Sequence, residues 1–237
     1  MSVHVPPDRR QSALDPVVRQ AGGVLVVHGG HAVVAHYGSA AGELAACVSA
    51  VGLADRSDLA TLVLEGPPAQ VKHLCQRLTG SEVVSGGAVP SGGAWWCAER
   101  PGRLLVICDA SRRDHLHAVL HARVMRRSAV TLTDRSLELA ALAVVGRHAS
   151  ALLAELDVYG ASGNPRHVPP LTAHSAAGAH VLWLLESDHK ALALVAAADA
   201  PAVWHAIERA GQRFGLCAVG QEALVRYALM RRIAGPL

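Results

Sequence analysis

Two adjacent tryptophans, Trp95 and Trp96, follow the paired glycines Gly92 and Gly93 and are the side chains best suited to hold a flat ligand. An indole ring offers a broad apolar face and one N–H donor, so it can stack on a planar heterocycle. Tryptophan is also common in protein cores and is favoured in subunit interfaces. Adjacent residues of an extended strand point to opposite faces. We therefore expect one tryptophan in the core and the other at a cavity or an interface.

Histidines are the second group with possible chemistry, because the chain contains 14 of them. His117 and His121 stand at the i, i+4 spacing that can chelate zinc from one helix face, with His115 nearby. No glutamate follows His117, as it would in the His-Glu-x-x-His motif of zinc proteases, and the charged neighbours indicate a solvated helix face. The sequence therefore predicts no metal site.

A repeated unit positions these side chains. Residues 55–57 (Asp-Arg-Ser) precede a strand that ends at Gly66, and residues 134–136 (Asp-Arg-Ser) precede a strand that ends at Gly146. An apolar helix follows each glycine, and glycine suits this place because the missing Cβ permits unusual φ and close approach. The repetition of the aspartates favours a structural role, in which each side chain accepts a hydrogen bond from the backbone two residues on.

The other elements alternate between hairpins and helices. The expected hairpins span 24–35, 94–108 and 180–196, and the expected helices span 69–78, 115–125, 149–156, 202–214 and 223–233. This alternation over a repeated unit predicts an α+β fold with antiparallel sheets and a pseudo-symmetric duplication. We expect an N-terminal arm at residues 1–21 with a short helix, and one domain at 22–237 made of pseudo-repeats at about 50–129 and 130–237.

Composition limits the partners. The chain is 51% hydrophobic and carries a formal charge of only +3, with its basic residues dispersed. A nucleic-acid surface needs a concentrated basic face, and a membrane span needs ~20 apolar residues, whereas the apolar run at 191–198 is far shorter. The start shows no secretory pattern, and the five cysteines lie far apart. We expect a cytoplasmic protein with free thiols that binds neither nucleic acid nor membrane.

Residues 51–59 (VGLADRSDL) carry a Gly-hydrophobic-x-Asp-x-Ser turn, and the strand after it ends in Gly-Pro-x-Ala at 66–69. These motifs, with further similarity at 133–149, around Trp204 and at 215–224, make the chain resemble a degenerate member of the glycine cleavage T-protein (aminomethyltransferase) superfamily over roughly residues 20 to 235. Folate-dependent demethylases and the gamma subunit of heterotetrameric sarcosine oxidase are relatives in that superfamily. True T-proteins end in an additional barrel domain, which we expect this chain to lack.

The resemblance implies a folate-shaped cavity between pseudo-symmetric halves, with tetrahydrofolate as the cofactor. Leu59 occupies the position that borders the folate pocket in the family, although core packing explains it equally well. Arg226 on the final helix is a candidate for an anionic glutamate tail or a carboxylate substrate, but a solvated helix arginine is the commoner outcome. The predicted ligand-binding residues are thus Leu59, Trp95, Trp96 and Arg226, and no catalytic residue is identified.

The chain departs from the family where the pterin would bind. Ala94 and Trp95 stand where T-proteins place adjacent aspartates, and residues 184–193 lack the family's glycines and its pterin-binding glutamate. A positioned acid contributes ~10²–10⁴-fold to such a rate. Aminomethyl transfer is therefore expected to be absent or slow, unless Glu99, Asp109 or a histidine enters the cavity from elsewhere.

Two functions follow as hypotheses. The first is an aminomethyltransferase-like protein that binds a folate or similar flat ligand and carries out tetrahydrofolate-dependent transfer of a methyl or methylene unit in a specialised pathway. The alternative is a non-catalytic subunit of a multi-subunit enzyme that resembles sarcosine oxidase gamma. A partner subunit or a homodimer is compatible with either.

Overall fold

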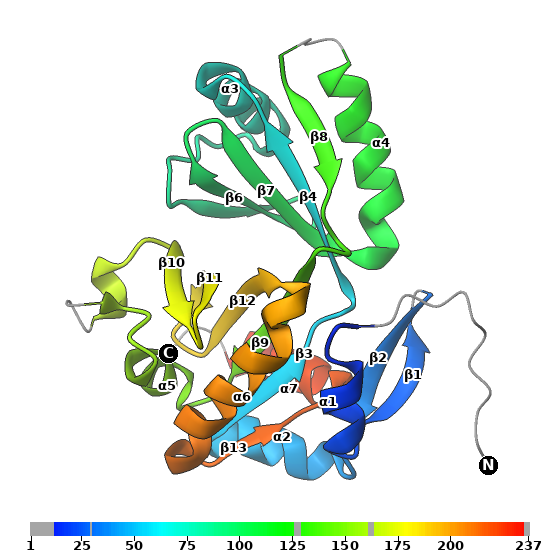
Figure 1. Cartoon of the computed structure of the whole chain (residues 1–237), viewed down its shortest axis with the longest axis vertical. Helices are drawn as coiled ribbons and strands as arrows, with labels where there is room; N and C mark the ends of the chain where they lie inside the picture. The colour runs from blue at the N-terminus through cyan, green and yellow to red at the C-terminus, as the bar shows by residue number, and fades with distance from the viewer. Residues whose placement is uncertain (1–11, 29, 126–128, 161–163, 235–237) are drawn as a thin grey trace.

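The protein is described by a computed structural model that covers residues 12–28, 30–125, 129–160 and 164–234. The strands are β1 (Val24–His28), β2 (His31–His36), β3 (Val51–Asp55), β4 (Leu59–Glu65), β5 (Ala88–Ser91), β6 (Ala94–Arg100), β7 (Arg103–Asp109), β8 (Thr131–Asp134), β9 (Leu139–Val145), β10 (Leu171–Ala176), β11 (Ala179–Ser187), β12 (Lys190–Ala196) and β13 (Leu216–Ala218). The α-helices are α1 (Asp15–Gln20), α2 (Ala40–Ser49), α3 (Pro68–Thr79), α4 (Arg113–Val124), α5 (Ala149–Glu155), α6 (Ala200–Gly211) and α7 (Gln221–Ala234). The hairpins and helices expected from the sequence are present, and the predicted α+β class is confirmed (Figure 1).

Two sheets repeat one strand order. The first sheet runs β5-β6-β7-β4-β8, and the second runs β10-β11-β12-β9-β3 with β13 added in parallel beside β3. The remaining pairs in both sheets are antiparallel. Each hairpin-and-strand series therefore has a counterpart in the other sheet, with α3 matching α5 and α4 matching α6. The predicted pseudo-symmetric duplication is confirmed.

The two Asp-Arg-Ser turns are the points at which the chain crosses between the sheets. β3 leads through the first turn into β4, and β8 leads through the second turn into β9, yet β3 pairs with β9 and β4 pairs with β8. The crossings match atom for atom, since the Arg56 N–H donates to the Ala141 carbonyl and the Arg135 N–H donates to the Thr61 carbonyl, both at 2.9 Å. The strand before each turn thus lies in one sheet, and the strands after the turn lie in the other (Figure 1).

The duplicated aspartates hold these turns. The Asp55 carboxylate accepts the Ser57 N–H at 3.0 Å, and the Asp134 carboxylate accepts the Ser136 N–H at 2.9 Å. The structural role that repetition predicted for both aspartates is confirmed by these hydrogen bonds.

Gly66 and Gly146 end the two equivalent strands because another backbone passes close to each. A Cβ on Gly66 would lie 2.4 Å from the Ala129 carbonyl oxygen, and one on Gly146 would lie 2.7 Å from the Ala50 carbonyl oxygen. Gly146 also has a φ of +130°, which an L side chain rarely adopts. The close neighbour is thus the segment that enters β8 or β3, not the helix after the glycine as the sequence suggested.

Three apolar clusters define the layers of the molecule. One lies between the first sheet and helices α3 and α4, a second lies between the second sheet and helices α1, α5 and α6, and the third lies where the two sheets face each other. The central strands β4, β7 and β12 are nearly continuous apolar runs, because both of their faces are covered. The facing sheets leave room for a cavity beside the third cluster.

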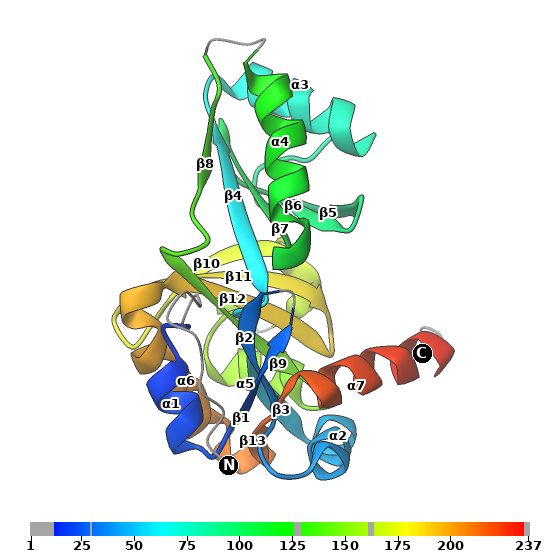
Figure 2. The ribbon, with the colours of Figure 1, turned by 90° about the vertical axis from the view of Figure 1, so that its right-hand side faces the viewer.

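The N-terminal segment packs on the domain. Leu14 and Val18 are fully buried in the cluster of the second sheet, so α1 covers part of that sheet and the described part of the predicted arm belongs to the core. Helix α7 runs beside α2 and β2 and carries the C-terminal end of the described chain outward (Figure 2). No helix in the described ranges is long and apolar enough to cross a membrane.

Candidate functional site

A cavity of about 400 Å³, here called the intersheet cavity, lies between the two sheets. It is lined by Arg56, Leu59, Pro90, Ser91, Gly92, Gly93, Ala94, Trp95, Ile107, Cys108, Asp109, Glu186, Lys190 and Leu192. Small-molecule sites in proteins typically measure ~300–1,000 Å³ and combine apolar walls with a few polar groups. The intersheet cavity has this size and this mixture.

A tight hairpin places Trp95 in the wall. Gly92 and Gly93 connect β5 to β6 with φ values of +59° and +73°, the left-handed pair that a two-residue turn of this kind requires. Ser91 then pairs with Ala94, and Trp95 pairs across β6 and β7 with Ile107. The paired glycines therefore fix which face of β6 the indole of Trp95 occupies.

The two tryptophans point to opposite faces of β6, as the alternation of side chains along a strand predicts. Trp95 is partly buried, lines the intersheet cavity and packs beside the cluster between the sheets. Trp96 is 4% exposed in the opposite cluster, under α3 and α4, where its indole N–H donates to the Ser91 carbonyl at 3.1 Å. Trp96 was among the predicted ligand-binding residues, and the structure places it in the core because it points to the other face of β6.

Two carboxylates, those of Asp109 and Glu186, line the intersheet cavity. Asp109 lies at the end of β7, next to the residue that pairs with Ala94, and Glu186 lies on β11. Burial raises the pKa of Asp109, but hydrogen bonds from Ser111, with smaller help from His28 and Arg56, outweigh this and hold the pKa below its ordinary value. Asp109 is therefore ionised at neutral pH.

Glu186 is held by a lysine. Its carboxylate accepts a hydrogen bond from the Lys190 ammonium at 2.9 Å across the β11–β12 hairpin, with only 14% of the Glu186 side chain exposed. The equivalent hairpin of the first sheet carries Glu99 bound to Arg103 at 2.7 Å. Glu99 does not line the intersheet cavity, whereas its counterpart Glu186 does.

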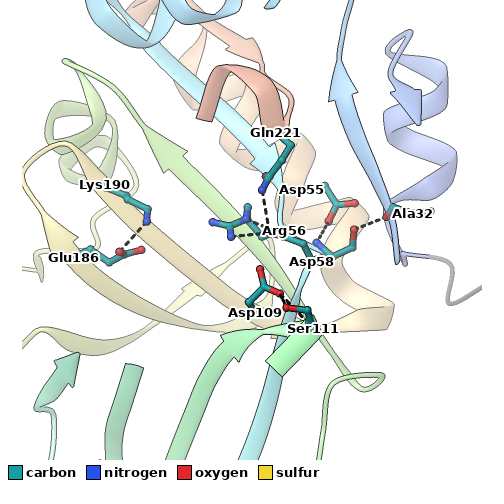
Figure 3. A network of polar contacts seen from close by, with 10 residues as sticks. Ala32, Asp55, Arg56, Asp58, Asp109, Ser111, Glu186, Lys190 and Gln221 are labelled. Atoms are coloured by element: carbon teal, nitrogen blue, oxygen red, sulfur yellow. Dashed lines mark hydrogen bonds and ion pairs between the residues drawn. The ribbon is translucent and has the colours of Figure 1, made fainter. Parts of the chain in front are cut away.

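Arg56 lies at the centre of the polar network (Figure 3). Its guanidinium donates to both carboxylate oxygens of Asp58, at 2.7 Å and 2.9 Å, and the Gln221 amide of α7 donates to the same carboxylate at 3.3 Å. Burial alone would lower the Arg56 pKa, but the Asp58 charge more than compensates and raises it. The first Asp-Arg-Ser turn therefore supplies a permanently charged group beside the cavity.

A second cavity of about 350 Å³, the turn cavity, shares Arg56 and Leu59 with the first. Both Asp-Arg-Ser turns reach it through Ser57 and Ser136. Asp55 also lines it, and burial raises the pKa of Asp55 from 3.8 to about 6, against the opposing hydrogen bonds of Ser12 and Ser57. The turn cavity thus combines polar and apolar lining residues at the crossing of the two halves.

The structure brings together only part of the predicted ligand set. Leu59 and Trp95 share the intersheet cavity, whereas Arg226 lies on the solvent side of α7 and pairs with Glu222 at 3.6 Å. His117 and His121 stack on α4 with ring centroids 6.1 Å apart. Within the described residues, no group of three or more potential ligands is placed to hold a metal ion.

From the sequence, Asp109 was a candidate to enter the cavity, whereas Arg56, Glu186 and Lys190 were not singled out. All four residues line the intersheet cavity. A signal for Glu186 and Lys190 was available, since both lie in the segment where the resemblance places a pterin-binding glutamate. No sequence signal distinguishes Arg56, because Arg135 stands in an identical Asp-Arg-Ser motif. In the structure Arg135 is exposed and pairs with Glu138.

The sequence matches no protein-family profile and no curated protein. Among solved structures, the glycine cleavage system aminomethyltransferase T from Bartonella henselae is similar with a TM-score of 0.70 and 15% identity, over 89% of this chain and 59% of that one. A heterotetrameric sarcosine oxidase chain from Corynebacterium sp. U-96 is similar with a TM-score of 0.59 and 19% identity, over 86% of this chain and 96% of that one. The chain thus spans about three fifths of the aminomethyltransferase. The fold that the resemblance implied is confirmed.

Proposed function

We propose that the intersheet cavity binds a reduced folate or a similar flat heteroaromatic ligand, as a step in tetrahydrofolate-dependent one-carbon transfer. The observation that carries the proposal is the convergence of three segments on one cavity. Leu59, Trp95 and residues 184–193 are far apart in the sequence, yet each supplies lining residues at a place where the resemblance locates folate binding. The likeness to an aminomethyltransferase supports the same reading at the level of the fold.

The lining suits the two sides of such a ring. Trp95 and Leu59 offer apolar surface to its faces, and stacking of a base on an aromatic side chain contributes ~1–3 kcal/mol. Asp109 and Glu186 offer carboxylate oxygens to its N–H groups, and charge-assisted hydrogen bonds of this kind are shorter and about twice as strong as neutral ones. Within one-carbon transfer, the Asp109 carboxylate would stabilise positive charge that develops on a ring nitrogen and accept its proton.

A direct test is equilibrium binding of 5-formyltetrahydrofolate to the purified chain. We expect saturable binding in the micromolar range, weakened about tenfold or more by Trp95→Ala because the stacking surface is lost. Trp96→Phe is the matched control, since it alters the neighbouring indole on the core side and should leave affinity unchanged. A chain that shows no saturation at millimolar ligand, or a Trp95→Ala variant with native affinity, would refute the proposal.

Free thiols support a cytoplasmic setting for this function. All five cysteines are unpaired, and four of them are buried. Such thiols persist in a reducing compartment.

A second candidate function, a non-catalytic subunit, is favoured by the ribbon of β1 and β2. Within the part of the chain that the structure describes, β1 pairs only with β2 and its other edge is free, and Val24, Val26 and Val27 are 44–47% exposed. A free apolar edge strand is a place where another chain can add. The structural match covers 96% of a chain from a heterotetrameric sarcosine oxidase, which agrees with a subunit role.

Co-expression with an oxidase-like subunit separates the two functions. A subunit role predicts one stable complex by sedimentation, which Val26→Lys splits because it places a charge at the free edge, together with no folate binding by the isolated chain. Folate binding by the isolated chain, unaffected by Val26→Lys, would instead support the first function.

A further inference from the structure

A third cavity, here called the helix cavity, adjoins the intersheet cavity at the β11–β12 turn. It measures about 290 Å³ and shares Arg56 and Lys190 with the intersheet cavity. Its lining residues are Arg56, Val145, Ser187, His189, Lys190, Gln221, Leu224, Val225, Tyr227, Ala228 and Arg231. A ligand whose ring occupies the intersheet cavity can therefore extend past Arg56 and Lys190 along α7.

The charges of the helix cavity have one sign. Arg56, Lys190 and Arg231 line it, and its lining contains no aspartate or glutamate. Arg56 and Lys190 are bound to Asp58 and Glu186, but Arg231 has no ion-pair partner among the described residues. One cation of the helix cavity is thus left without an anionic partner in the described part of the chain.

His189 adds a second unused polar group. Its Nδ1 atom is buried and has no hydrogen-bond partner among the described residues. A buried ring nitrogen without a partner is unfavourable by ~1–3 kcal/mol, so a ligand oxygen placed there would remove that penalty. His189 lies in the turn after β11 and lines the helix cavity.

Most of the other lining residues are apolar. Val145, Leu224, Tyr227 and Ala228 surround the charged groups, and Arg231 lies close enough to Tyr227 to oppose the raising effect of burial on the Tyr227 pKa. Apolar walls with cations among them suit an apolar linker, such as a p-aminobenzoyl group, that ends in a carboxylate.

From this arrangement we infer that the helix cavity takes a carboxylate-bearing tail of the ligand, with Arg231 and His189 as its recognition groups. The inference rests on the proposed function, because the ring of the same molecule must occupy the intersheet cavity. It assigns the tail to Arg231 instead of Arg226, which lies outside the helix cavity.

The test compares two ligands, 5-formyltetrahydrofolate and 6-methyltetrahydropterin, which lacks the carboxylate tail. Arg231→Gln should weaken 5-formyltetrahydrofolate about tenfold, the value of a lost charge-assisted hydrogen bond, and leave the tail-free pterin unchanged. Arg232→Gln is the matched control, because it removes the neighbouring exposed charge outside the helix cavity and should affect neither ligand. His189→Phe should reproduce the selective loss in smaller degree.

The outcomes are distinguishable. If the pterin and the folate bind with equal affinity, or if Arg231→Gln weakens both alike, the inference is wrong while ring binding in the intersheet cavity stands. If neither ligand binds the native chain, the proposed function fails and the tail site fails with it. Identical thermal unfolding of Arg231→Gln and Arg232→Gln excludes misfolding as the cause of a difference.

Discussion

The Arg56 guanidinium donates two hydrogen bonds to the Asp58 carboxylate, from Nε to Oδ1 at 2.7 Å and from Nη2 to Oδ2 at 2.9 Å. Only 15% of the Arg56 side chain and 4% of the Asp58 side chain are exposed. Arg56 lines the intersheet, turn and helix cavities, whereas Asp58 lines none of them and holds the guanidinium from behind. Arg56 is thus the wall residue that all three cavities have in common.

Arg56→Gln should lower the free energy of unfolding by about 3 kcal/mol, because removal of one partner leaves a buried charge on Asp58 without compensation. Urea titration of the purified variant measures this. Arg135→Gln is the matched control from the equivalent turn, where the Arg135 side chain is 40% exposed and its pair with Glu138 should contribute at most about 1 kcal/mol. Equal losses in both variants would contradict the special role of the buried pair.

Gly146→Ala should destabilise the protein by about 3 kcal/mol, because the new methyl group meets the Ala50 and Cys47 carbonyl oxygens and the φ of +130° is unfavourable for alanine. Gly80→Ala separates the two causes, since Gly80 also has positive φ at +76° but nothing within 4 Å of the added Cβ. That variant should lose only about 1–2 kcal/mol. Thermal and urea unfolding of both proteins gives the comparison.

The raised pKa of Asp55 predicts that the stability of the protein depends on pH. Its pKa in the folded protein is about 6, above the ordinary 3.8, so folding favours its protonated form. The stability it contributes is present below pH 4 and is lost as pH rises through 6, by about 2–3 kcal/mol. The free energy of unfolding of the native protein, relative to Asp55→Asn, should therefore fall between pH 4 and 7.

The control for this pH effect is Asp134→Asn, because Asp134 holds the equivalent turn but is exposed. This variant retains Asp55, so urea unfolding should show its free energy of unfolding falling between pH 4 and 7 as that of the native protein does. A constant difference between the native protein and Asp55→Asn across this range would exclude Asp55 as the titrating group.

The fold could be predicted largely from local signals. The repeated Asp-Arg-Ser turns and the glycines after their strands report backbone geometry, which depends on few neighbours, and both copies adopt the same turn. Helix α2 was not predicted, because its alanine-rich sequence shows little periodicity. Its start is marked only by Ser39, whose side chain accepts the Gly42 N–H at 3.2 Å.

The candidate site was less accessible to sequence reasoning. Strand alternation predicts that only one of the two tryptophans lines a cavity. Which one does so depends on the face of β6 that meets the second sheet, and the sequence does not show this. Arg56 and Arg135 stand in identical motifs, and only tertiary contacts bury one and expose the other. Such differences arise from contacts between distant segments and leave no local pattern.

The hairpin carboxylates offer the sharpest test of the intersheet cavity. Glu186 pairs with Lys190, and Glu99 pairs with Arg103, at equivalent places in the two halves. Glu186→Gln should weaken 5-formyltetrahydrofolate binding about tenfold, because a charge-assisted hydrogen bond to the ring is replaced by a neutral one. Glu99→Gln breaks the matching ion pair outside the cavity and should leave affinity unchanged.

Isothermal titration calorimetry of both variants decides the matter, since each loses one hairpin ion pair and any common effect on folding cancels in the comparison. The expected result is a loss confined to Glu186→Gln. A similar loss in Glu99→Gln would mean that hairpin stability, and not contact with the ligand, controls affinity. Native affinity in Glu186→Gln would leave Asp109 as the sole carboxylate available to a ring bound against Trp95.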